Sequence, residues 1–319
     1  PPPHAMYLGI EIGGTKLQLA VAAEGAGRLD DLVRLDVAPD LGAERIRQRI
    51  AAAGRRLIAE HPVEAIGVGF GGPVDAAAGR SITSHQVAGW ENFPLVQWCQ
   101  ETLGPPTVLV NDSDAAGLAE ARFGAGQGSR VVFYSNVGSG IGGALVIDGT
   151  LYPGGGGVAA ELGHLRPGLD CRSARQTVES LASGWGMADA ARRQVAQNPQ
   201  TSAAIDLLRR CEGAPRRLTA KILAEAAEEG NALAASAFHH ACQVYGWALA
   251  QMITLLAPNV VVLGGGVSLV GEKRFLDPLR AHVDRYVFPP LRESFALRLA
   301  ALGEQVVLHG AIALAAAAR

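Results

Sequence analysis

Two acidic residues, Glu11 and Asp112, stand where an apolar run gives way to a polar or glycine-rich stretch. Glu11 comes two residues before Gly13-Gly14-Thr15-Lys16, and Asp112 follows Asn111 directly after the apolar run Thr107–Val110. Open α/β sheets bind ligands at the carboxyl ends of their strands, so Asp112 is a candidate general base. The alternative is a helix cap, a common role for Asn and Asp at a strand-to-helix junction, and both roles can coexist.

Three glycine-rich loops follow apolar runs: Gly13-Gly14-Thr15-Lys16, Gly138-Ser139-Gly140 and Gly264-Gly265-Gly266. Glycines let backbone N–H groups approach phosphate oxygens, and Thr15 or Ser139 can add a hydroxyl. The first loop lacks Walker spacing, and the second satisfies GxGxxG but leads into a β-branched apolar segment instead of a helix. A tight hairpin turn is the alternative for either loop alone. The presence of three such loops favours phosphate binding, with Lys16 facing either solvent or the rim of the phosphate site.

A third polar group lies in the segment after a run of four glycines. Glu161 and His164 are three residues apart, and Glu179 follows fifteen residues later. A lone histidine is more often structural than a ligand. Two carboxylates and a histidine this close to a glycine run indicate a polar pocket.

Composition excludes several classes of protein. The chain has 319 residues, which fits one large or two ordinary domains. Its formal net charge is −2 and it has no basic block, so we expect no nucleic-acid partner. It has no low-charge apolar run long enough to span a membrane. The four cysteines are scattered without a CxxC pair, which argues against a disulfide framework and fits a reducing, cytoplasmic location.

The elements that must position these groups alternate between strands and helices, which is typical of an α/β layer fold. We predict strands over Leu8–Ile12, Leu17–Ala22, Leu32–Val37, Ala65–Phe70, Thr107–Val110, Val131–Asn136 and Ala296–Ala301, and helices over Ala43–Ala59, Ala115–Arg122 and Glu304–Ala318. The chain between Gly168 and about Leu256 is expected to be mostly helical. The strand–glycine-turn–strand pattern occurs at the start and again near Val131, so the sequence predicts two related halves.

At these residues the chain resembles the ROK family of sugar kinases and sugar-responsive repressors, within the actin/hexokinase superfamily. The resemblance runs from about Leu8 to the C-terminus. It is carried by the stretches IEIGGTK, VGFGGPVD, VNDSDAAGLAE, NVGSGIGGALVIDGTLYPGGGGVAAELGH and VVLGGGVS. It implies a two-domain actin-like ATPase (ribonuclease H-like) fold with an interdomain cleft. We expect residues 6–115, joined by the C-terminal helix 304–319, to form one domain and residues 116–303 to form the other.

The resemblance also implies a role for each candidate residue in an ATP-dependent hexose kinase. Asp112 would take the proton from a sugar hydroxyl, most simply O6. Residues Gly72, His85, Asn111, Glu161, His164 and Glu179 would lie on the sugar side. Residues Glu11, Gly13, Gly14, Thr15, Lys16, Gly138, Ser139, Gly140, Gly265 and Gly266 would lie on the side of ATP and Mg²⁺. The family also implies a homodimer.

The sequence departs from the family pattern in three places. Glu11 stands where the family usually has Asp, which moves the carboxylate out by one methylene, and Mg²⁺ demands tight octahedral geometry. Asp170, Arg172 and Thr177 stand where many members have zinc-binding cysteines, so we predict no structural zinc. His85 replaces a frequent Asn, and Gly71 replaces the usual Pro, so the sugar pocket is expected to be altered.

The main functional prediction is therefore a glucokinase-like kinase acting on glucose or a related hexose or N-acetylhexosamine. A degenerate kinase that binds sugar but turns over poorly is the first alternative, motivated by Glu11, His85 and the missing cysteines. The second is a sugar-responsive regulator. Regulators of the family carry a DNA-binding domain ahead of the first strand, and here that strand is expected to start at about Tyr7.

Overall fold

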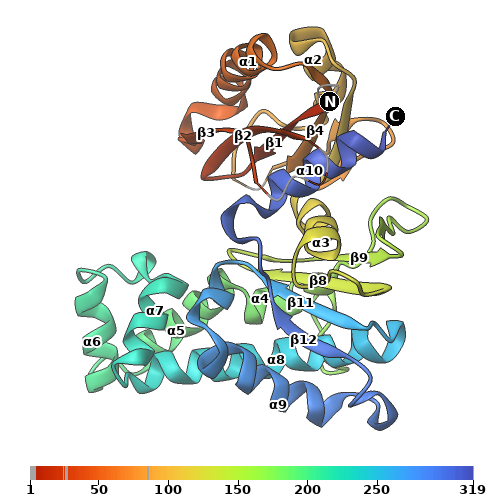
Figure 1. Cartoon of the computed structure of the whole chain (residues 1–319). Coiled ribbons are helices and arrows are strands. Elements are labelled where there is room, and N and C mark those ends of the chain that lie inside the picture. The colour runs from red at the N-terminus through yellow and green to blue at the C-terminus, as the bar shows by residue number, and fades with distance from the viewer. Residues whose placement is uncertain (1–4, 24, 26–27, 85, 319) are drawn as a thin grey trace. The chain divides into compact units, whose positions relative to one another are not determined.

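The computed structural model describes residues 5–23, 25, 28–84 and 86–318, and its chain divides into two compact units. The first unit comprises Pro1–Ser129, Ala144–Ala159 and Ala300–Arg319, and the second comprises Arg130–Gly143 and Ala160–Leu299. The described strands form two five-stranded sheets with helices beside them (Figure 1). The two sheets match the two related halves predicted from the sequence.

The first sheet has the order β3-β2-β1-β4-β7. Its strands are β1 (Met6–Ile12), β2 (Lys16–Ala23), β3 (Asp31–Asp36), β4 (Val63–Phe70) and β7 (Thr107–Asn111). Strands β1, β2 and β3 pair antiparallel, whereas β1, β4 and β7 run parallel. The carboxyl ends of β1, β4 and β7 therefore meet at one edge, which is where the sequence places Glu11, Gly72 and Asp112. A short hairpin, β5 (Val74–Asp75) and β6 (Arg80–Ser81), follows β4.

Strand alternation decides which face of the first sheet each side chain occupies. Leu8, Ile10 and Ile12 belong to the core that also contains the buried residues of α1 (Gly42–Glu60) and α2 (Leu95–Leu103). Tyr7 packs instead with the C-terminal helix α10 (Val306–Ala317). Successive strand side chains point to opposite faces, so Glu11 shares the Tyr7 face. The C-terminal helix is thus part of the surroundings of the first glycine loop.

Helix α3 (Asp112–Phe123) packs closely on α10 within the first unit. A Cβ atom on Gly310 would lie 1.8 Å from the carbonyl oxygen of Ala115, and one on Gly67 of β4 would lie 1.9 Å from that of Ala311. Small residues are therefore required where α10 meets its neighbours. Because of this packing, all of α3 falls in the first unit, which differs from the boundary expected at residue 115.

The second sheet has the order β10-β9-β8-β11-β12. Its strands are β8 (Val131–Val137), β9 (Ile141–Ile147), β10 (Thr150–Leu151), β11 (Val260–Gly264) and β12 (Ala296–Leu299). The division between the units falls inside β9. Strands β8, β11 and β12 are parallel, so the loops after β8 and β11 leave the same edge of the sheet.

The segment after Gly168 is mostly helical, as predicted. Its helices are α4 (Val178–Ala182), α5 (Gly184–Gln197), α6 (Ser202–Arg210), α7 (Ala220–Glu228), α8 (Ala232–Leu256) and α9 (Asp277–Tyr286). Single turns of 3₁₀ or π helix fill many connections, namely Pro39–Leu41, Leu162–His164, Pro215–Arg217, Gly266–Val270, Glu272–Leu276, Pro289–Leu291 and Gly303–Gln305. Strand β12 ends two residues before the predicted limit at Ala301.

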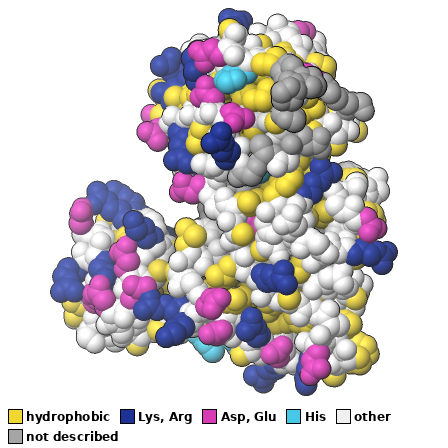
Figure 2. Space-filling view, viewed as in Figure 1, with side chains coloured by type: hydrophobic (Ala, Val, Ile, Leu, Met, Phe, Trp, Pro, Cys, Tyr) yellow, Lys and Arg dark blue, Asp and Glu magenta, His cyan; other side chains and the backbone are white. Residues whose placement is uncertain are grey.

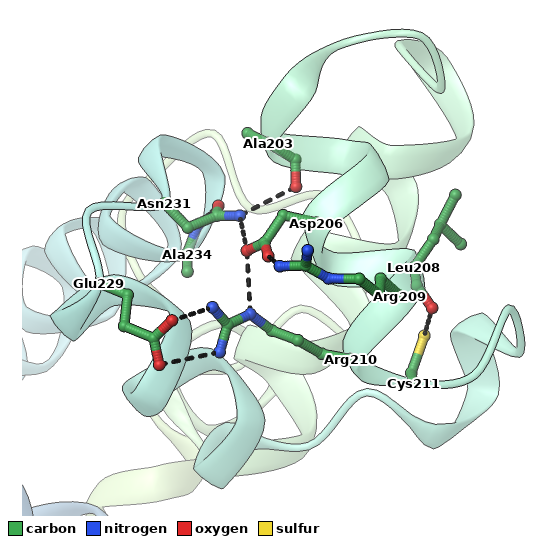
Figure 3. Close-up of polar contacts among 9 residues, drawn as sticks. All are labelled: Ala203, Asp206, Leu208, Arg209, Arg210, Cys211, Glu229, Asn231 and Ala234. Carbon is green, nitrogen blue, oxygen red and sulfur yellow. Dashed lines mark hydrogen bonds and ion pairs between the residues drawn. The ribbon is translucent and has the colours of Figure 1, made fainter.

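An ion-pair network joins α6, the end of α7 and the start of α8 (Figure 3). Arg210 donates to Asp206 at 2.9 Å and forms a forked contact with Glu229 at 2.6 and 3.4 Å. Asn231 caps α8 and also donates to Asp206 and to the carbonyl oxygen of Ala203, both at 2.9 Å. The hydrogen bond from Arg210 lowers the pKa of Asp206. These contacts are structural, since they satisfy helix ends and fix three helices together.

On the face in view, acidic and basic side chains are interspersed and form no extended block of one sign (Figure 2). This distribution agrees with the net charge of −2. Among the described helices, none is both long and apolar enough to cross a bilayer.

Candidate functional site

Glu11 is a nearly buried carboxylate near the end of β1, 5% exposed. One oxygen pairs with the Lys16 ammonium at 3.0 Å, and the other accepts from the Gln18 side chain at 2.9 Å. Burial raises the pKa of Glu11, Lys16 opposes that rise, and the charge of Asp112 adds to it. The two acids thus lie within electrostatic range of each other, at the carboxyl ends of β1 and β7 on either side of β4.

Lys16 connects the first glycine loop to the C-terminal segment. Its ammonium also donates to the carbonyl oxygen of Glu304 at 3.1 Å, and Gln18 donates to the same oxygen at 3.3 Å. Arg34 of β3 donates in turn to Gln18. The sequence left open whether Lys16 faces solvent or the phosphate site, and in the structure its ammonium contacts Glu11 and Glu304. It neutralises Glu11 and ties β2 to the turn that precedes α10.

The first glycine loop is a tight turn closed by a hydrogen bond from the Gly13 N–H to the Lys16 carbonyl oxygen at 2.9 Å. Gly14 has the Gln86 side chain against it, because a Cβ atom there would lie 1.6 Å from Gln86 Oε1. Thr15 is exposed at the tip. The loop thus combines the hairpin geometry of the simpler interpretation with an accessible hydroxyl.

Asp112 is the first residue of α3, half-buried beside the first loop. A Cβ atom on Gly71 would lie 3.4 Å from both the Asp112 Oδ2 atom and Gly13 Cα. The side-chain oxygen of Asn111 accepts from the Ser113 N–H at 2.8 Å, and its amide donates to the Gly72 carbonyl oxygen at 2.9 Å. Asn111 thus caps α3, which leaves Asp112 near the loops at the ends of β1 and β4.

The residues of the first unit that were predicted on the sugar side differ in their structural surroundings. Gly72 lies at a close backbone approach, where a Cβ atom would be 2.6 Å from the Thr83 carbonyl oxygen. The side-chain amide of Asn111 donates to the Gly72 carbonyl oxygen, and its oxygen accepts from the Ser113 N–H. A contact between Asn111 and the sugar stays a prediction. His85 lies outside the described residues.

The second glycine loop joins β8 to β9 in the second unit. The Gly138 N–H donates to the Gly140 carbonyl oxygen at 2.9 Å, and Ser139 is exposed at the tip. The Glu179 carboxylate accepts from the Ile141 N–H at 2.8 Å, at the far end of the loop. Glu179, predicted on the sugar side, is therefore also a partner of the loop backbone.

The loop after β11 packs directly against the end of β8. Gly265 has a φ of 86°, and a Cβ atom there would lie 2.4 Å from the Val137 carbonyl oxygen. Gly266 begins the 3₁₀ turn Gly266–Val270, and the Ser268 hydroxyl donates to the Gly265 carbonyl oxygen at 2.7 Å. The second unit thus brings two of the predicted phosphate-side loops together.

Glu161 precedes the 3₁₀ turn Leu162–His164, which packs on the start of β9. The His164 Nε2 atom is 3.8 Å from a Glu161 oxygen, and a Cβ atom on Gly163 would lie 2.3 Å from the Ile141 carbonyl oxygen. Partial removal from water raises the pKa of Glu161, His164 opposes this, and the charge of Glu179 adds to it. Ala160, just before Glu161, has a strained φ of 62°. Glu161, His164 and Glu179 thus lie close together within the second unit, and the polar pocket expected from them stays a prediction.

The donor atoms in the segment corresponding to the family's zinc motif do not fit a zinc ion. The Cys171 thiol donates to the Gln176 carbonyl oxygen at 2.9 Å, and the Thr177 hydroxyl caps α4 in a reciprocal capping box with Ser180. Structural zinc takes four sulfur or nitrogen ligands. Elsewhere in the described chain, Asp31, Glu60 and His61 cluster on the surface, but Arg56 pairs with both acids there.

Carboxylate oxygens near the first loop do fit a magnesium ion. Glu11 and Asp112 supply hard oxygen donors, which Mg²⁺ prefers. Each Glu11 oxygen has one nitrogen partner and retains acceptor capacity beyond it.

Sequence reasoning missed the supporting polar residues Gln18, Gln86 and Glu120. Glu120 of α3 is fully buried and accepts from the N–H groups of Ala301, Leu302 and Ala125. A Glu within an apolar helical stretch, AAGLAEA, was the available clue to a satisfied buried charge.

Comparisons with known proteins agree with this arrangement. The chain is 31% identical over 313 residues to a glucokinase of Halalkalibacterium halodurans, covering 95% of this chain and 93% of that protein. It is 31% identical over 278 residues to an N-acetylmannosamine kinase of Salmonella typhi, covering 86% and 87%. A crystal structure of a ROK family glucokinase from Streptomyces griseus, in complex with glucose and AMPPNP, superposes with a TM-score of 0.82 at 33% identity, covering 98% and 100%.

These matches confirm the α/β, actin-like fold class predicted from the sequence. The model of the ROK family matches residues 7–318, so the chain belongs to the ROK family.

Proposed function

We propose that the protein is an ATP-dependent hexose kinase in which Asp112 is the general base. The observation that carries this proposal is the placement of Asp112 at the carboxyl end of β7, beside the first glycine loop. The similarity to glucokinases along nearly the whole chain supports the reaction class. Asp112 would accept the proton of the attacking hydroxyl, for which we propose O6.

The glycine loops would hold ATP through their backbone N–H groups. Thr15 and Ser139 are exposed at the tips of their loops and would add hydroxyl donors. Mg²⁺, when bound, would neutralise charge on the transferred phosphoryl group. Glu11 and Asp112 would hold the ion, directly or through water. On the sugar side, we propose that Glu161 and His164 accept and donate hydrogen bonds to hydroxyl groups.

Replacing Asp112 by Asn tests the assignment of the base. The substitution keeps the shape and removes the proton acceptor, so sugar-dependent ADP formation should fall roughly 10²–10⁴-fold. The melting temperature should change little, because the Asn111 cap of α3 remains. Unchanged turnover would remove Asp112 from the mechanism.

A second candidate is a weak kinase that binds its ligands and turns over slowly. The specific observation in its favour is that both Glu11 oxygens are engaged, by Lys16 and Gln18. Restoring the usual family residue with Glu11→Asp separates the two. A large rise in turnover favours the weak kinase, and an unchanged rate favours the ordinary one.

We propose glucose or an N-acetylhexosamine as the substrate, since relatives of both kinds have similar identity to this chain. A panel of hexoses in a coupled ADP assay decides between them. We further propose a cytoplasmic homodimer without structural zinc, on the basis of family resemblance and the cysteine-poor donor set. Light scattering tests the dimer, and elemental analysis tests the zinc.

A further inference from the structure

The backbone of the second glycine loop is held from three sides within the second unit. Glu179 accepts from the Ile141 N–H at 2.8 Å, and Asn136 accepts from the Gly142 N–H at 2.9 Å. The carbonyl oxygen of Gly138 accepts from the Gly184 N–H, also at 2.9 Å. A loop meant to present N–H groups to phosphates gains from being fixed in advance, because less ordering is then required on binding.

The sequence around Glu179 is adapted to this contact. A Cβ atom on Gly140 would lie 2.5 Å from the accepting Glu179 oxygen, and one on Gly184 would lie 2.7 Å from the Gly138 carbonyl oxygen. Any other residue at either glycine would push the carboxylate or the helix away from the loop. Gly140 in the loop and Gly184 at the start of α5 therefore permit these close contacts.

Glu179 is itself fixed by the helices that carry it. Helix α4 begins with a capping box between Thr177 and Ser180, on either side of Glu179. The Glu179 carbonyl oxygen accepts from the N–H of Ser183, which caps α5, and α5 begins at Gly184. Helix α4, the start of α5 and the loop therefore form one hydrogen-bonded assembly.

We propose that Glu179 is a positioning residue that holds the second phosphate loop in its binding conformation. This role rests on the proposed function and differs from the sugar contact that the sequence predicted. The proposed role also determines which property of the Glu179 side chain is important. A negative charge beside bound phosphates is unfavourable, so the useful property of Glu179 is its acceptor oxygen and its reach, not its charge.

A pair of substitutions separates acceptor from charge. Glu179→Gln keeps an acceptor oxygen at the same reach and removes the charge, so the Kd for AMPPNP, measured calorimetrically without sugar, should stay within about threefold of wild type or improve. Glu179→Ala removes the acceptor, and the Kd should rise roughly tenfold. Hydrogen exchange at the Ile141 amide should accelerate in Glu179→Ala and stay slow in Glu179→Gln.

Glu161→Ala is the matched control, because Glu161 lies in the same carboxylate cluster and its carboxylate is directed at His164. It should weaken sugar binding and leave the Kd for AMPPNP unchanged. Wild-type nucleotide affinity in Glu179→Ala would overturn the proposal, and so would equal losses in Glu179→Gln and Glu179→Ala.

If the kinase assignment were wrong and the role of Glu179 correct, the measurements would differ from those above. The wild type would then bind AMPPNP and show the same variant pattern, yet form no ADP with any sugar. A wild type that binds no nucleotide would overturn the role of the loop together with the kinase assignment.

Discussion

Glu120 offers the sharpest test of how the first unit is held together. Its carboxylate is fully buried and accepts three backbone N–H groups, from Ala301 and Leu302 at 2.9 Å and from Ala125 at 2.8 Å. Ala125 lies just before the chain leaves the first unit, and Ala301 just after it returns. One side chain thus fixes two connections that are 176 residues apart, taking 301 minus 125.

The substitution Glu120→Gln alters this arrangement with almost no change in volume. Two N–H groups would keep a neutral acceptor, which is weaker than a charged one, and the Ala125 N–H would meet a donor. Hydrogen bonds to charged groups are worth about 1.5–3 kcal/mol each, and a buried unpaired donor costs about 1–3 kcal/mol. We therefore expect the free energy of unfolding to fall by about 2–5 kcal/mol.

Urea denaturation followed by circular dichroism measures this loss, with Glu101→Gln as the control. Glu101 is exposed on α2, so the same change of charge there should stay within about 0.5 kcal/mol of wild type. Burial already lowers the pKa of His309, and the charge of Glu120 opposes that shift. NMR titration of Glu120→Gln should therefore show a further fall in the His309 pKa.

Equal unfolding free energies for Glu120→Gln and Glu101→Gln would refute the reasoning, since they would mean that the three N–H groups gain nothing from a buried carboxylate. An unchanged His309 pKa would separately refute the electrostatic coupling between α3 and α10.

Two further predictions concern pH and packing. The folded-state pKa of Glu11 lies above its ordinary value of 4.5, so its contribution to stability is complete below that value and is lost as pH rises through the folded pKa. The stability difference between wild type and Glu11→Gln, from urea melts at several pH values, should follow this loss, and a difference independent of pH would contradict it. Gly310→Ala would place a methyl group against the Ala115 backbone and should cost about 1–3 kcal/mol or more in thermal melts, whereas Gly156→Ala, which meets open space, should cost far less. Equal melting temperatures for the two alanine variants would show that α10 can move away from α3 freely.

Much of the fold could be predicted because hydrophobic periodicity and glycine turns are local features. The apolar spacing of Ile46, Ile50 and Leu57 correctly predicted α1, and all three are buried. The ends of elements were less accurate. Strand β12 stops at Leu299, since Ala301 and Leu302 turn their N–H groups toward Glu120 instead of a neighbouring strand. A partner 181 residues away leaves no trace in local sequence pattern.

The candidate site was predicted as a set of residues, but the sequence could not divide that set by role. Residue type and spacing identify Glu11, Asn111 and Glu179 as polar groups beside glycine loops. They do not say which atoms those groups contact. That depends on strand alternation, which turns Glu11 toward Lys16, and on backbone approach, which brings Glu179 to Ile141.

Three glutamates of the chain use their carboxylates to accept hydrogen bonds or ion pairs from other parts of the protein. Glu11 accepts from Lys16 and Gln18, Glu120 from three backbone N–H groups, and Glu179 from the N–H at the end of the second loop. Carboxylates are strong acceptors, so they can fix the turns around a phosphate site while the glycines provide the close approach. Replacing Glu by Gln should therefore preserve nucleotide binding at 179, where one oxygen accepts from the Ile141 N–H, and lower stability at 120, where both oxygens accept from backbone N–H groups.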